Sequence, residues 1–165
     1  MNARAESLVR DLGMLPHPEG GYYVETYRSP DLVTTSRGAT RSALTTIFFL
    51  LADGGFSRWH RVLADEAWHY YEGSALVLRW VTGDGERVVE AELGPLAEHE
   101  RRAQRTPGLV VPAGCWQAAE TTGDYTLVGC TVGPGFDFAD FELLRDHHDA
   151  AARIVARHPE ARRWL

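Results

Sequence analysis

The stretch GGFSRWHRVLADEAWHYYEG, residues 54–73, decides the fold. It predicts two strands, 56–62 and 66–72, because both runs are rich in aromatic and branched side chains and end at turn residues. A turn at 63–65 joins them, and Gly73 ends the second strand. The sequence therefore predicts a pair of neighbouring strands at this point of the chain.

Alternation along the first strand places polar side chains on one face. Side chains two positions apart share a face of a strand. Arg58, His60 and Val62 are therefore expected to point the same way. The turn brings Glu66 onto the neighbouring strand beside them, which predicts a histidine–carboxylate pair inside the fold.

The second strand follows the same rule. Its inner face is expected to carry Glu66, Trp68, Tyr70 and Glu72. His69 points to the opposite face, and only a bulge would turn it inward.

Short strands continue on both sides of this pair. Runs of aromatic and branched residues between turns are expected to form strands at 22–28, 43–51, 75–81, 87–93, 109–111, 116–120 and 125–132. Many short strands at this spacing are typical of an all-β sandwich or barrel. Residues 94–107 predict a charged loop, and residues 136–143 predict an edge strand or a packed loop. Strands do not alternate with helices, which disfavours a doubly wound fold.

Helices are expected only near the two ends of the chain. Residues 4–12 place apolar side chains on one face, and residues 146–157 have a helical pattern. The sequence has no internal repeat and no sign of a second domain. We therefore expect one domain over residues 1–165, with a barrel core at about 20–143.

Composition limits the classes of partner. The chain has 17 basic and 23 acidic residues, a net charge of −6, whereas nucleic-acid-binding proteins usually carry a basic face. The longest apolar run, 47–52, is too short to cross a bilayer, and the first residues do not form a signal peptide. We expect a cytoplasmic protein with neither a nucleic-acid nor a membrane partner.

The strand pair contains a motif that resembles the first motif of the cupin superfamily. Gly54, His60, Glu66 and Gly73 fall at the spacing of that motif. Val62 stands where the motif has a second histidine.

A later stretch resembles the second cupin motif through the Pro-Ala-Gly turn at 112–114, while Thr106 replaces its glycine and Gln117 its histidine. Three strings are similar to the uncharacterised Cupin 5 family: HPEGGYYVETYRS (17–29), SRWHRVLADEAWHYYEG (57–73) and VPAGCWQAAETTGDYTLVGCTVGPGFDF (111–138). The resemblance covers about residues 10–145. It implies a cupin-type double-stranded β-helix, or jelly-roll barrel, with a pocket in its lumen and a homodimeric assembly. It implies no particular substrate.

The resemblance raises the question of a metal cofactor. Metal-binding cupins use three histidines and one glutamate, and only His60 and Glu66 stand at matching positions. Val62 cannot ligate, and Gln117 is a poor ligand for a transition metal. We expect no metal; if one binds, its ligands would come from His60, Glu66, His69 and Gln117.

The expected pocket offers groups for proton transfer and for binding. Histidine moves protons near neutral pH, so His60 is the candidate catalytic acid or base and Glu66 the carboxylate that orients it. The candidate ligand-binding residues are Arg58 for an anionic group, Gln117 for a polar group, Tyr23, Tyr27, Trp68 and Tyr70 as stacking walls, and His69. A structural alternative stays open, in which His60 is a bonded core histidine and Arg58 pairs with Glu66.

Three functions remain open at this point. The first is a metal-independent isomerase or epimerase that acts on a sugar-like or polar carbonyl ligand through His60. The second is a ligand-binding or sensing module without catalysis. The third is a metal-dependent cupin enzyme such as a dioxygenase.

Other residues receive plainer assignments. Cys115 and Cys130 flank a turn at 121–124 and would lie opposite each other in a hairpin centred there, but buried, reduced thiols are expected. The remaining histidines are expected to be solvated: His17, His99, His147, His148 and His158. The aromatic segment GGYYVETYR, residues 20–28, is expected to pack at a dimer interface.

Overall fold

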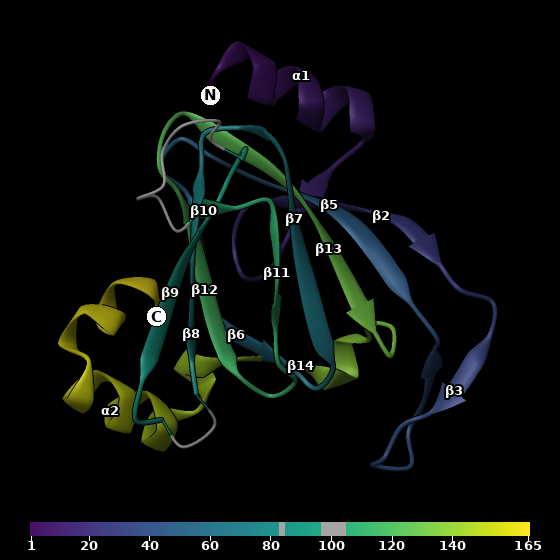
Figure 1. Cartoon of the computed structure of the whole chain (residues 1–165), viewed down its shortest axis with the longest axis vertical. Helices are drawn as coiled ribbons and strands as arrows, with labels where there is room; N and C mark the ends of the chain where they lie inside the picture. Colours follow the sequence, from purple (N-terminus) through teal and green to yellow (C-terminus); the bar gives the residue numbers. More distant parts are fainter. Residues whose placement is uncertain (83–84, 97–104) are drawn as a thin grey trace.

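Short β-strands dominate the part of the chain that the computed structural model describes, residues 1–82, 85–96 and 105–165 (Figure 1). In chain order the strands are β1 (Leu15–Pro16), β2 (Tyr22–Arg28), β3 (Leu32–Thr34), β4 (Thr40–Ser42), β5 (Thr45–Ala52), β6 (Phe56–Val62), β7 (Asp65–Gly73), β8 (Leu76–Val81), β9 (Val88–Leu93), β10 (Arg105–Thr106), β11 (Gly108–Val111), β12 (Trp116–Thr121), β13 (Tyr125–Gly133) and β14 (Phe141–Leu143). The α-helices are α1 (Ala3–Leu12) and α2 (His148–Arg157), and the 3-10 helices are η1 (Phe138–Asp140), η2 (Leu144–Asp146) and η3 (Pro159–Trp164).

Two six-stranded sheets form the body of the molecule. The strand order is β1-β2-β5-β13-β7-β11 in the first sheet and β10-β9-β8-β12-β6-β14 in the second. Side chains from both sheets meet in one apolar cluster between them. The short strands β3 and β4 form a separate hairpin that extends away from this body (Figure 1). This arrangement confirms the predicted all-β jelly roll.

Most predicted elements occur where the sequence placed them. The bounds predicted for β2 and β6 are those observed. β14 pairs with β6 at the edge of the second sheet, so the edge-strand alternative for residues 136–143 is confirmed for its last part. α2 begins two residues later than predicted, because η2 comes first. The hairpin of β3 and β4 was not predicted, and residues 97–104 of the predicted charged loop lie outside the described residues.

The space between the sheets is packed with apolar side chains at one end of the barrel. Leu51, Leu76, Leu78 and Leu93 are fully buried there. Burial of one such side chain contributes roughly 2 kcal/mol. This end therefore holds the barrel together and leaves the opposite end free for a cavity.

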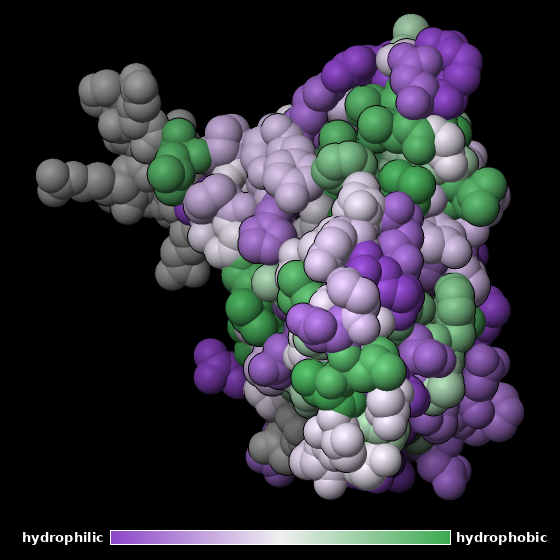
Figure 2. All heavy atoms as spheres, turned by 90° about the vertical axis from the view of Figure 1, so that its right-hand side faces the viewer, coloured by the Kyte–Doolittle hydropathy of each residue, from purple (hydrophilic) through white to green (hydrophobic). Residues whose placement is uncertain are grey.

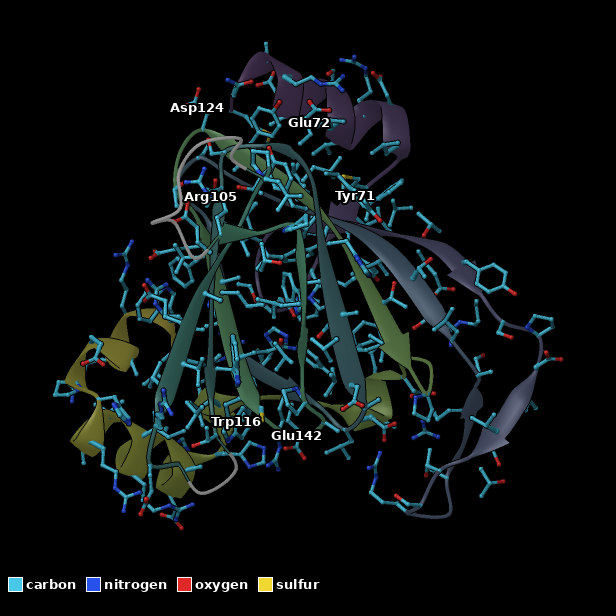
Figure 3. The ribbon with its side chains drawn as sticks, viewed as in Figure 1. Tyr71, Glu72, Arg105, Trp116, Asp124 and Glu142 are labelled. Atoms are coloured by element: carbon cyan, nitrogen blue, oxygen red, sulfur yellow. The ribbon has the colours of Figure 1, made fainter. Side chains whose placement is uncertain are left out.

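Helix α1 covers the outer face of the first sheet. Ala5 and Leu8 on its buried side pack in one cluster with Leu50 and Leu127. At the exposed edge of the helix, Arg4 donates two hydrogen bonds to Glu72, whose position beneath α1 is labelled in Figure 3. No helix in the described part of the chain is long and apolar enough to cross a bilayer.

The C-terminal helices cover the outer face of the second sheet. Trp59, on β6, contacts Trp164 edge to face and donates a hydrogen bond to the carbonyl oxygen of Ala161 at 2.8 Å. Because Trp59 points out of the barrel, its neighbour His60 points in.

The two cysteines do not face each other across a hairpin. The strand after Cys115, β12, belongs to the second sheet, whereas β13, which carries Cys130, belongs to the first. The turn between these strands therefore crosses from one sheet to the other, and the predicted hairpin is wrong. Both side chains are buried as free thiols.

Candidate functional site

A cavity of about 460 Å³ opens at the end of the barrel near β14. This end is the one at which Glu142, the residue after Phe141, is labelled in Figure 3. The cavity is lined by His17, Glu19, Tyr23, Glu25, Arg28, Thr45, Ile47, Phe49, His60, Val62, Glu66, Cys130, Val132, Phe136, Asp137, Phe138 and Phe141. A cavity of this size suits a small molecule.

The carboxylate of Glu19 joins two histidines at the inner wall. Its Oε2 atom lies 3.2 Å from His17 Nδ1 and 3.3 Å from His60 Nε2. Its other oxygen accepts a hydrogen bond from Ser57 Oγ at 2.8 Å. The side chains of this network are almost completely shielded from water, so the charge of Glu19 depends on these partners.

The loop between β1 and β2 places Glu19 in the barrel. The backbone amide of Arg58 donates to the Glu19 carbonyl oxygen at 2.8 Å, which fixes the loop against β6. Gly20 has a φ of 115°, and a Cβ atom there would lie 2.3 Å from the carbonyl oxygen of Phe56. Glycine is required for this close approach.

The hydrogen bonds of His60 define where its protons lie. Nδ1 donates to the carbonyl oxygen of Arg58 at 2.8 Å, because a carbonyl oxygen can only accept. Nε2 faces the Glu19 carboxylate. A proton on Nε2 would form an ion pair of imidazolium and carboxylate with Glu19.

The two carboxyl groups near His60 have opposite pKa displacements. Burial by itself would raise the pKa of Glu19, but the charges and hydrogen bonds of His60, His17 and Ser57 lower it below its usual value. Burial raises the pKa of Glu66, and the negative charge of Glu19 adds to this. Of the two, Glu19 therefore ionises first as the pH rises, and Glu66 retains its proton to a higher pH.

Glu66 is held by a chain of hydrogen bonds from the barrel core. Gln117 Nε2 donates to Glu66 Oε2 at 2.5 Å, and Trp68 Nε1 donates to Gln117 Oε1 at 3.1 Å. Gln117 and Trp68 are fully buried and do not line the cavity. They position Glu66 and are not placed to touch a ligand.

A bulge in β6 changes which residue accompanies His60. The register between β6 and β12 shifts by one residue between Ser57 and His60. Ser57, with its Oγ atom 3.3 Å from His60 Nδ1, therefore shares the inner face. The guanidinium of Arg58 lies over the ring of Phe56 and donates to the backbone of Glu19. The expectation that Arg58 points into the pocket is wrong.

A bulge in β2 likewise changes which of its side chains line the cavity, on the wall formed by the first sheet. The register between β2 and β5 shifts between Glu25 and Tyr27, so Glu25 and Arg28 line the cavity. Tyr27 is 51% exposed and lies outside it, contrary to prediction. The register between β7 and β13 also shifts near the end of β7. Glu72 therefore does not lie on the inner face, and its carboxylate binds Arg4.

The other predicted residues divide between cavity and core. Tyr23 lines the cavity together with His60 and Glu66. Tyr70 packs against the core and donates a hydrogen bond to the carbonyl oxygen of Gly73 at 2.6 Å. His69 is not among the lining residues, as the alternation of β7 predicts.

Sequence reasoning missed His17 and Glu19. His17 was expected to be solvated, but its side chain is only 7% exposed because the loop before β2 folds into the barrel. The available signal was the string HPEGG, in which a histidine and a carboxylate stand between proline and glycines. Of the other histidines, His148 is exposed, His147 is about one third exposed, His158 is mostly buried, and His99 lies outside the described residues.

The residues at the cupin metal positions do not fit a metal ion. Val62 has no ligating atom, and both polar atoms of the Gln117 carboxamide already bind protein groups. His69 does not line the cavity. Over the described residues, no group of three or more His, Cys, Asp or Glu side chains is arranged to hold a metal.

Comparison with known proteins finds relatives that match most of the chain. Residues 6–144 match the model of the family described as Cupin superfamily (DUF985). The structure of protein SO0799 from Shewanella oneidensis is similar, with 35% identity, a TM-score of 0.74 and coverage of 87% of this chain and 84% of that chain. A hypothetical protein from Leishmania major has 34% identity, a TM-score of 0.72 and coverage of 84% and 85%. The uncharacterized protein YML079W of Saccharomyces cerevisiae is 26% identical over 156 residues, which are 85% of this chain and 75% of that protein.

Proposed function

We propose that the barrel cavity of this chain, which belongs to the family described as Cupin superfamily (DUF985), binds a small polar ligand. The cavity moves a proton on that ligand without a metal. The observation that carries the proposal is the convergence of His60, Glu19 and Glu66 on one cavity. The reaction is an isomerisation or epimerisation of a sugar-like or other polar carbonyl compound. A proton leaves the carbon next to the carbonyl group and returns to the same or a neighbouring carbon.

His60 is the group that takes up and returns this proton. Its Nδ1 atom is fixed by the Arg58 carbonyl, so exchange is confined to Nε2. Glu19 lies beside Nε2 and stabilises the imidazolium that forms when the proton arrives. Glu19 is therefore a positioning residue that acts through His60.

Glu66 supplies the complementary acid. Burial raises the pKa of its carboxyl group, and a carboxyl group that keeps its proton can donate it to a carbonyl oxygen. Gln117 holds this group by a hydrogen bond to one oxygen. The pair of His60 and Glu66 then offers a base and an acid in one cavity.

Deuterium incorporation tests the proposal. The protein is incubated in D₂O with a panel of sugars and hydroxycarbonyl compounds, and deuterium next to the carbonyl is measured by NMR. We expect incorporation with the natural chain, a loss of about a hundredfold in His60→Gln, and no effect of a chelator. His148→Gln, on the exposed side of α2, is the matched control. Equal incorporation by His60→Gln, or none with any compound, would contradict catalysis.

A binding module without catalysis is the second candidate. Both ring nitrogens of His60 already face protein groups, and the residue is 2% exposed, which also fits a structural histidine. In that case a ligand that raises the melting temperature would raise it equally in His60→Gln. Retained binding with no deuterium incorporation would select this function.

We also propose that the chain forms a homodimer. β3 is exposed along its whole length, and its Leu32 is 68% exposed. An isolated two-stranded hairpin is marginally stable in water. Figure 2, which views the molecule from the side of β2 and this hairpin, shows separate apolar patches on that face among hydrophilic residues. A second copy covering this surface would support the hairpin and bury these side chains.

A further inference from the structure

We propose that the ligand of the cavity is an organic cation, a protonated amine on a small carbon frame. The inference deepens the proposed function and rests on it only in taking the cavity as the ligand site. The cavity wall combines an excess of carboxylates with a cluster of aromatic rings.

Acidic side chains outnumber basic ones on the wall. Glu19, Glu25, Glu66 and Asp137 all line the cavity. Arg28 is the single lysine or arginine among the lining residues that the structure describes. His17 and His60 do not reverse this balance, because both face the carboxylate of Glu19.

Each of the three nitrogens of Arg28 already donates to a protein acceptor, and Glu25 balances the charge of the guanidinium. Its Nε and Nη2 atoms donate to the two carboxylate oxygens of Glu25 at 3.0 and 2.7 Å. Its Nη1 atom donates to the carbonyl oxygen of Phe136 at 3.1 Å. Arg58, the other candidate for binding an anion, does not line the cavity. A phosphate or carboxylate ligand would therefore have to compete with Glu25 for the single lysine or arginine among the described lining residues.

The remaining carboxylates keep acceptor capacity. Glu66 accepts a hydrogen bond from Gln117 at the inner wall, and Asp137 accepts one from the backbone amide of Ala139 at the mouth. A carboxyl oxygen without a proton accepts hydrogen bonds, and a carboxylate that is ionised offers about four acceptor positions. A ligand that donates hydrogen bonds would therefore complement the acceptor groups of this wall.

The aromatic side chains of the mouth provide a surface for the same kind of ligand. Phe136, Phe138 and Phe141 contact one another at centroid distances of 5.1 to 6.1 Å. His17 stacks on Phe138 and meets Tyr23 edge to face. Ammonium groups are attracted to ring faces, and more strongly where water is excluded. Rings and carboxylates together favour an ammonium group over a neutral hydroxyl group.

A matched set of probes separates charge from shape. Cyclohexylammonium, cyclohexanol and cyclohexanecarboxylate share one ring and differ in a single charged or neutral group. Each is titrated into the full chain near neutral pH, and binding is followed by the melting temperature and by NMR. We expect the ammonium to bind about tenfold more tightly than the alcohol, and the carboxylate to bind least. Added salt should weaken only the ammonium.

Variants locate the preference in the cavity. Asp137→Asn should reduce the advantage of the ammonium over the alcohol by about fivefold. Asp146→Asn removes an exposed carboxylate that is not among the lining residues, and should leave the advantage unchanged. Because Asp137 and Asp146 are both exposed, these two variants are expected to fold alike.

The outcomes distinguish this inference from the proposed function. If the alcohol or the carboxylate binds as tightly as the ammonium, or if none of the three binds, the charge assignment is overturned. Deuterium incorporation into an uncharged compound would then leave the proposed function standing. A clear ammonium preference without any deuterium incorporation would support the charge assignment and overturn proton transfer.

Discussion

At the residue scale, the chemistry of the cavity depends on a carboxyl group that is not paired with a cation. Glu66 is buried and accepts a hydrogen bond from the neutral amide of Gln117. Burial raises its pKa, and the charge of Glu19 contributes, while the nearby His60 partly opposes the shift. The ionised form is therefore less favourable in the folded protein than in the unfolded chain.

This predicts a pH-dependent effect of Glu66→Gln on stability. Because the folded-state pKa lies above the unfolded one, the natural chain loses stability as pH rises through the folded-state pKa of Glu66. Glutamine avoids this loss and can still accept from Gln117. The melting temperature of the variant, relative to the natural chain, should rise from acid to alkaline pH and be higher above neutrality. Glu90→Gln, at an exposed glutamate, is the control. A difference that is independent of pH would contradict the assignment.

The residues of the site could be predicted only in part. His60 and Glu66 belong to one strand pair, so spacing along the chain was enough to bring them together. Glu19 and His17 come from a loop whose path depends on Gly20 passing close to β6. That approach is a long-range contact, and no local pattern in the sequence determines it.

At the element scale, bulges decide which side chains reach the cavity. The bulge in β6 puts Ser57 beside His60 where regular alternation would put Arg58. The bulge in β2 puts Arg28 on the wall where alternation would put Tyr27. A bulge depends on how a strand pairs with its neighbour. The strands themselves could be predicted from periodicity and turns, and their inner faces only up to the bulge.

Two tyrosines on β2 test this correction. Tyr23 lies before the bulge and lines the cavity, whereas Tyr27 lies after it and is exposed. Tyr23→Ala should weaken binding of cyclohexylammonium by about tenfold, through lost aromatic contact. Tyr27→Ala should leave the affinity within about twofold of the natural chain, as expected for an exposed site. Isothermal titration of both variants checks this, and a larger loss for Tyr27→Ala would place the bulge elsewhere.

At the scale of the whole molecule, the barrel has one packed end and one open end. Leucines fill the packed end, and the cavity occupies the other. The all-β fold could be predicted because every strand signal lies between two terminal helices. The hairpin of β3 and β4 could not, since its strands are three residues long and pair with no other strand among the described residues.

The hairpin carries the prediction for assembly. Leu32→Asp combined with Val33→Asp places two charges on its exposed apolar surface and should shift a dimer to monomer, because unpaired charges are costly at an apolar interface. Light scattering coupled to gel filtration gives the mass. Leu96→Asp, at another exposed leucine outside the hairpin, should remain dimeric. A natural chain that is monomeric at micromolar concentration would contradict the proposed dimer.

The proposed function requires His60 to be a proton-exchanging group on the wall of a ligand cavity. Nitrogen NMR of ring-labelled histidine tests it most directly, because it reports the protonation of each ring nitrogen. We expect a protonated Nδ1 on His60 and an Nε2 resonance that moves when Glu19 is replaced by glutamine or when a cavity ligand is added. A His60 protonated only on Nε2, or one whose resonances ignore both changes, would contradict it.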